Sequence, residues 1–69
     1  MSQLFKVKAF IPDMGSYTTN AHANGTESAE ENALWSFNSA RRHDGLSEMT
    51  LEDFKRWRRH GNITFTPIN

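Results

Sequence analysis

Two stretches of alternating residues near the start of the chain constrain its fold most strongly. Over residues 4–11 apolar side chains occupy every second position, with lysines between them. Phe10 departs from this pattern because it falls on the lysine side. Residues 17–23 alternate again, after a turn sequence in which Gly15 can take a positive φ angle. Period-two alternation is typical of half-buried strands, so the sequence predicts a β-hairpin over residues 4–23.

The segment after the hairpin has the pattern of an amphipathic helix over residues 29–43. Its apolar residues recur at spacings of three and four: Ala29, Ala33, Leu34, Phe37 and Ala40. Ser28 and Glu31 fit a capping box, in which each side chain accepts a hydrogen bond from the other residue's backbone N–H. Gly45 is placed to end the helix.

A shorter helix and a last strand complete the predicted elements. Thr50 can cap a helix over residues 51–60, in which Leu51, Phe54 and Trp57 form a narrow apolar stripe. Residues 62–68 then alternate as a strand. Pro67 lacks a backbone N–H, so this strand is expected at an edge of the sheet or at its own terminus.

These elements predict a single α+β domain that covers residues 1–69. Their order is β-hairpin, helix, short second helix and final strand, which favours a small antiparallel or mixed three-stranded sheet with the helices on one face. A chain of 69 residues has no room for a second domain. The strand order stays open, because the last strand can return beside either hairpin strand.

The composition excludes several classes of protein. Eight Lys and Arg residues balance eight Asp and Glu residues, which argues against a globally basic nucleic-acid-binding protein. The lack of cysteine excludes a disulfide scaffold and Cys-based zinc sites. No run approaches the roughly 20 apolar residues of a membrane span, and the start lacks the apolar region of a signal peptide. We therefore expect a cytoplasmic protein without a membrane partner.

The sequence is poor in residues for catalysis or for cofactors. Its serines lack the context of a nucleophile elbow. His22, His43 and His60 lack the spacing of a helical zinc site, and the four scattered glycines form no phosphate-binding loop. We therefore predict no enzymatic activity, no metal and no cofactor.

A basic cluster in the second helix is the strongest candidate for function. It consists of Lys55, Arg56, Arg58 and Arg59 around Trp57, joined by Arg41 and Arg42 if the two helices pack side by side. Three interpretations stay open: a solvated face that complements the helix dipole, a contact with an acidic patch on a partner protein, or a contact with nucleic-acid phosphates.

Two aromatic residues are secondary candidates for partner binding. Trp35 lies next to the apolar stripe of the first helix, so we expect it at the edge of the core, with an exposed binding anchor as the other interpretation. Tyr17 follows the hairpin loop, where it can reach a partner.

The run FKVKAFIPDMGSYTTNAHANGTESAEENALWSF combines a hairpin with a helix that opens on small and acidic residues. This outline resembles small accessory proteins of bacteriophages, including inhibitors of host RNA polymerase and anti-CRISPR proteins. The resemblance covers residues 4–40, rests on pattern without a diagnostic motif and carries over no functional residue. The second helix departs from that outline. The resemblance implies a protein that acts by occluding a site on a host machine.

We therefore expect a small non-enzymatic module, a phage-type inhibitor or modulator, that binds a protein in the host cytoplasm. The candidate contact residues are Lys55, Arg56, Arg58, Arg59, Arg41, Arg42, Trp35 and Tyr17. The alternative is a small nucleic-acid-binding protein that uses the basic second helix. A homodimer is a third interpretation, since the basic cluster and the acidic residues Glu27, Glu30 and Glu31 at the start of the first helix could pair head to tail with a second copy.

Overall fold

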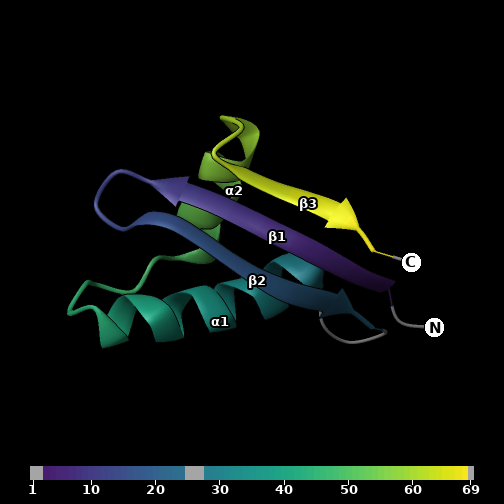
Figure 1. Ribbon diagram of the computed structural model, residues 1–69, viewed down its shortest axis with the longest axis horizontal. Helices are drawn as coiled ribbons and strands as arrows, with labels where there is room; N and C mark the ends of the chain where they lie inside the picture. Colours follow the sequence, from purple (N-terminus) through teal and green to yellow (C-terminus); the bar gives the residue numbers. More distant parts are fainter. Residues whose placement is uncertain (1–2, 25–27, 69) are drawn as a thin grey trace.

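A β-hairpin and a third strand form one antiparallel sheet, and two helices connect the hairpin to that strand (Figure 1). The computed structural model describes residues 3–24 and 28–68. Its elements are β1 (Gln3–Ile11), β2 (Gly15–Ala23), α1 (Ala29–His43), α2 (Leu51–Arg59) and β3 (Ile63–Pro67). The predicted α+β class and the order of the elements are confirmed.

The strand order in the sheet is β2-β1-β3, so β1 lies in the centre. Both neighbours pair with β1 in the antiparallel direction, with Val7 opposite Thr19 on one side and Phe65 on the other. This order settles the position that the sequence left open. It also places Pro67 on an edge strand, where the missing N–H breaks no ladder between strands.

The hairpin loop has the geometry that its turn sequence predicts. The Met14 N–H donates to the Ile11 carbonyl at 2.9 Å, which closes a tight turn. Gly15 follows at φ +82°, in the left-handed region that favours glycine. The glycine lets the chain re-enter the sheet with Ile11 opposite Gly15, and this pairing sets the register of the whole hairpin.

The hydrophobic core forms between one face of the sheet and both helices. It contains Val7, Ala9, Ile11, Ala21, Ala33, Phe37, Phe54 and Ile63, all buried. The rings of Phe37 in α1 and Phe54 in α2 meet edge to face at 5.5 Å between centroids. Phe54 also meets Phe65 of β3 edge to face, so aromatic contacts link both helices to the sheet.

Each helix begins at a side-chain cap. Ser28 accepts from the Glu31 N–H at 3.1 Å, while the Glu31 carboxylate accepts from the Ser28 N–H at 3.4 Å. This is the predicted capping box. Thr50 accepts from the Asp53 N–H at 3.1 Å in α2. The second helix ends at Arg59, one residue earlier than predicted.

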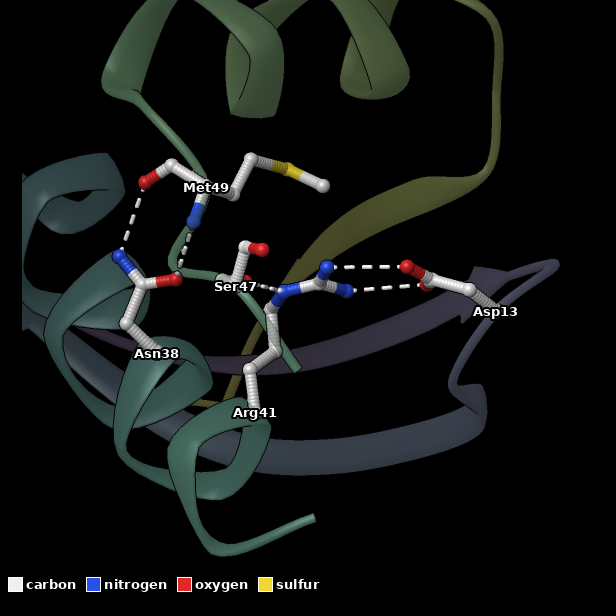
Figure 2. Close-up of polar contacts among 5 residues, drawn as sticks. All are labelled: Asp13, Asn38, Arg41, Ser47 and Met49. Atoms are coloured by element: carbon white, nitrogen blue, oxygen red, sulfur yellow. Dashed lines mark hydrogen bonds and ion pairs between the residues drawn. The ribbon is translucent and has the colours of Figure 1, made fainter. Parts of the chain in front are cut away.

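Two buried polar side chains of α1 hold the loop between the helices in place (Figure 2). The Asn38 amide donates to the Met49 carbonyl at 2.9 Å and accepts from the Met49 N–H at 2.8 Å. Arg41 donates from Nε to the Ser47 carbonyl at 2.6 Å. These bonds satisfy backbone groups of a loop that has no regular structure of its own.

Arg41 also ties α1 to the tip of the hairpin. Two guanidinium N–H groups donate to the two carboxylate oxygens of Asp13 at 3.0 and 2.9 Å (Figure 2). Arg41 is 6% exposed, while the Asp13 side chain is half exposed. The bidentate geometry compensates for the burial of the guanidinium charge.

Replacing Arg41 by lysine tests how far its hydrogen bonds stabilise the fold. Lysine keeps the charge but cannot donate to Ser47 and to both oxygens of Asp13 at once. We expect Arg41→Lys to lower the free energy of unfolding by about 1–3 kcal/mol in urea titration. Arg42→Lys is the matched control, because Arg42 forms an exposed ion pair and should change stability by less than about 0.5 kcal/mol. Equal losses in both variants would contradict this assignment.

Replacing Asp13 by asparagine tests the same ion pair through pH. Hydrogen bonds from Arg41 hold the pKa of the folded Asp13 carboxyl below its ordinary value. The ion pair therefore stabilises the fold above about pH 4, and this contribution is lost as the pH falls through the lower pKa of the folded state. We expect Asp13→Asn to lower the melting temperature at neutral pH.

The decrease in melting temperature caused by Asp13→Asn should become smaller as the pH falls to about 3, because the wild-type carboxyl is then increasingly protonated. Asp44→Asn is the control, since it removes a carboxylate that has no ion pair with any described residue. A loss in Asp13→Asn that stays the same from about pH 7 to about pH 3 would rule out the ion pair as its cause.

Candidate binding surface

The basic cluster of α2 is exposed, but half of it is neutralised within the molecule. Arg56 forms an ion pair with Asp53 at 3.0 Å, one turn earlier in the same helix. Arg58 pairs with Glu30 of α1 at 3.1 Å, and its guanidinium lies over the Phe65 ring at 4.2 Å from the centroid. Arg58 therefore connects α2 to α1 and β3, which gives it a structural role.

The other two cations of the cluster remain available. Lys55 and Arg59 are exposed, and neither forms an ion pair with a described residue. Two unpaired charges make a much weaker positive surface than the four that the sequence shows side by side.

The cations at the end of α1 do not extend this cluster. Arg41 is buried, and its hydrogen bonds to Asp13 raise the pKa of the guanidinium further above its ordinary value. Arg42 is exposed but pairs with Glu48 at 2.9 Å. The two helices do pack together, which was the condition for Arg41 and Arg42 to join the basic cluster. Arg41 nevertheless points toward the hairpin tip and does not join an exposed basic patch (Figure 2).

Tyr17, which the sequence places where it can reach a partner, is half-buried and makes contacts within the domain. Its hydroxyl donates to the Ser36 carbonyl at 3.2 Å, and its ring meets Phe37 edge to face at 5.8 Å. The hairpin register places it opposite Ala9, on the core face. The alternation of residues 17–23 already carried this signal, since it sets Tyr17 on the same face as Ala21.

Trp35 is 73% exposed, so its expected place at the edge of the core is wrong. Ala33 and Phe37 are buried, and position 35 lies about 200° around the helix from both of them. Trp35 therefore points away from the sheet. This agrees with the other interpretation, in which Trp35 is an exposed anchor for a partner.

A hollow of about 330 Å³ lies beside Trp35 and spans both helices and their connecting loop. Leu34 and Leu51 contribute half-buried apolar surface to it. The full lining is Glu31, Leu34, Trp35, Asn38, Arg42, Glu48 and Leu51. The hollow thus combines a large aromatic side chain, apolar surface and charges of both signs.

A larger hollow of about 490 Å³ lies at the other side of α2. Its lining is Asp53, Arg56, Trp57, His60 and Asn62. Trp57 is half-buried and packs against the core, as its place in the apolar stripe predicts, and its ring meets His60 at 6.4 Å. Because Trp57 is tied to the core, it offers a partner less free surface than Trp35 does.

The open face of the sheet is a further exposed surface, and the sequence analysis did not include it among the candidate sites. Lys6 and Lys8 project from β1 on this face, together with Phe10, which is 56% exposed. No helix within residues 3–24 and 28–68 covers this face of the sheet (Figure 1). The position of Phe10 on the lysine side of the alternation was the signal that could have identified it.

No protein-family model, curated protein or solved structure matches this chain. Neither of the described helices is long and apolar enough to cross a membrane. Within the part of the chain that the structure describes, no group of three or more His, Asp or Glu side chains is placed to hold a metal ion. The choice among these surfaces therefore rests on their own geometry.

Unfolding of two tryptophan variants tests the different environments of these residues. Trp35→Ala removes an exposed side chain and should change the free energy of unfolding by less than about 0.5 kcal/mol. Trp57→Ala removes a ring that packs against the core and should cost about 2–3 kcal/mol, below the range of a fully buried ring. Urea titration followed by circular dichroism measures both values. A loss in Trp35→Ala as large as that in Trp57→Ala would contradict the exposed placement.

Proposed function

We propose that this protein is a small non-enzymatic protein-binding module whose partner packs over Trp35. The observation that carries the proposal is the exposure of this tryptophan beside a hollow between the helices. Tryptophan is among the most frequent anchors of protein interfaces, because its large rigid ring buries much area at little entropic cost. The Trp35 ring is not among the residues that form the core or pack against it, so its exposure is not explained by a role in the fold.

The charges around Trp35 favour a protein over a nucleic acid as the partner. Glu31 and Glu48 line the hollow, and Arg42 is already paired with Glu48. Carboxylates at this position would repel a phosphate backbone, whereas a protein surface can match charges of both signs. A ring of charged groups around an apolar anchor is the usual arrangement of a protein interface.

The alternative function, nucleic-acid binding by α2, has less support. Arg56 and Arg58 each pair with a carboxylate, so phosphates would have to compete with Asp53 and Glu30. Lys55 and Arg59 alone would contribute few phosphate contacts. Trp57 between them is half-buried against the core, which leaves little ring surface on which a base could stack.

The resemblance to phage accessory proteins extends the proposal to the partner. In this hypothesis the partner is a host protein, and the module acts by covering a site on its surface. A compact domain with an exposed tryptophan suits this role, since an occluding protein needs a rigid shape and an anchor, without catalytic groups.

Capture with a matched pair of variants tests the proposal. The wild-type protein and Trp35→Ala are immobilised and exposed to a lysate of the cells in which the protein acts. A protein retained by the wild type is then purified and titrated against both. We expect Trp35→Ala to raise the dissociation constant by about 30-fold or more, as loss of an interface hot spot does.

Ile68→Ala is the control, because Ile68 is also an exposed apolar residue but lies after β3, away from α1. It should bind as the wild type does. Equal affinities of the wild type and Trp35→Ala would contradict the proposal. Self-association of the isolated chain that Trp35→Ala abolishes would instead identify a second copy as the partner.

A further inference from the structure

The open face of the sheet carries a regular array of polar and basic side chains. Lys6 and Lys8 stand in its centre because β1 is the middle strand. The pairing register surrounds them with neutral hydrogen-bonding groups: Asn20 and Thr66 flank Lys6, and Thr18 and Thr64 flank Lys8. Neither lysine has an ion pair with a described residue, so both ammonium groups are free to meet a ligand.

The described carboxylates all lie elsewhere in the molecule. Asp13 is in the hairpin turn, and the others are in the helices or in the loop that joins them: Glu30, Glu31, Asp44, Glu48, Glu52 and Asp53. Although the net charge is zero, the charges are unevenly distributed. The described carboxylates lie in the turn and the helical layer, and the charged side chains at the centre of the open sheet face are lysines. Such a face attracts an anion although the whole chain is neutral.

Phe10 supplies an exposed aromatic ring at one end of this face. Asn62 holds both hydrogen-bonding groups of the Phe10 backbone: the Phe10 N–H donates to the Asn62 carbonyl, and the Asn62 side-chain amide donates to the Phe10 carbonyl, both at 2.9 Å. The ring therefore stands on a fixed platform while remaining 56% exposed. A shallow hollow of about 350 Å³ extends from it past Lys8 and Thr18.

We infer that this open face binds single-stranded nucleic acid, a function beyond the protein contact at Trp35. Side chains two residues apart on a strand are about 7 Å apart, so Lys6, Lys8 and Phe10 form an evenly spaced row along β1. The lysines meet successive phosphates, and an unstacked base lies on the Phe10 ring. This combination of a basic track with an aromatic platform is how open sheets hold single strands.

The composition of the face favours this ligand over a protein. Lysine is depleted at the centre of protein interfaces, yet two lysines lie at the centre here. A duplex fits less well, because its bases are stacked inside and leave nothing to lie on Phe10. The hydroxyl and amide groups beside the lysines can meet the sugars and the edges of bases without demanding one sequence.

Fluorescence anisotropy with labelled oligonucleotides tests the inference. The probes are 12-nucleotide single strands of mixed sequence, as DNA and as RNA, and the duplex of the same sequence. At 50 mM salt we expect a dissociation constant of about 1–100 µM for the single strands and weaker binding of the duplex. Two phosphate contacts give a salt slope of about −1.4, which is about a sevenfold loss between 50 and 200 mM.

Two variants assign the binding to this face. Lys6→Gln with Lys8→Gln should reduce the affinity at least tenfold and bring the salt slope close to zero. Phe10→Ala should weaken binding by about five- to a hundredfold with the salt slope unchanged, because stacking carries no counterion release. Circular dichroism establishes that each variant is folded, as expected for exposed side chains.

The matched control is Lys55→Gln with Arg59→Gln, which removes the same charge from the unpaired cations of α2. It should bind the single strands within about twofold of the wild type. If this variant loses binding while Lys6→Gln with Lys8→Gln still binds the single strands, the binding site lies on α2 and the inference is overturned. No binding of either single strand at 50 mM salt would also overturn it.

Discussion

The arrangement of the domain depends on the hydrogen bonds that the buried Arg41 guanidinium makes to Asp13 and Ser47. A charge that is 6% exposed must be compensated, and Asp13 and the Ser47 carbonyl provide that compensation from two other segments. One side chain of α1 thereby holds the tip of the hairpin and the loop before α2. In a chain without disulfides, this contact takes over a constraint that small domains often obtain from a covalent link.

The surfaces left for binding follow from this arrangement. Asn38 and Arg41 fix the loop so that α2 packs beside α1, and Phe54 can then reach Phe37 in the core. Both described helices pack against the same face of the sheet, and within residues 3–24 and 28–68 no helix covers the opposite face. Trp35 is exposed for the same reason, because the side of α1 that carries Phe37 is committed to the sheet.

The sequence predicted what local patterns determine and missed what depends on distant partners. Alternation and capping residues gave the hairpin, both helices and the cap at Ser28, because these features form within a few neighbouring residues. The strand order and the ion pair of Arg41 with Asp13 join residues far apart in the chain, 28 positions in the case of the ion pair. The basic cluster looked stronger in the sequence than in space, since Glu30 reaches Arg58 only after folding.

The two proposed surfaces lie on different layers, and this separation bears on how such a small domain could act. Trp35 is on the outer side of α1, whereas Lys8 and Phe10 are on the face of the sheet that no described helix covers. The core lies between these layers, so a ligand on one surface need not displace a ligand on the other. If both proposals hold, the domain would suit a protein partner that itself holds a single strand. Binding both components at once would then make each contact strengthen the other through effective concentration, even where each is weak alone.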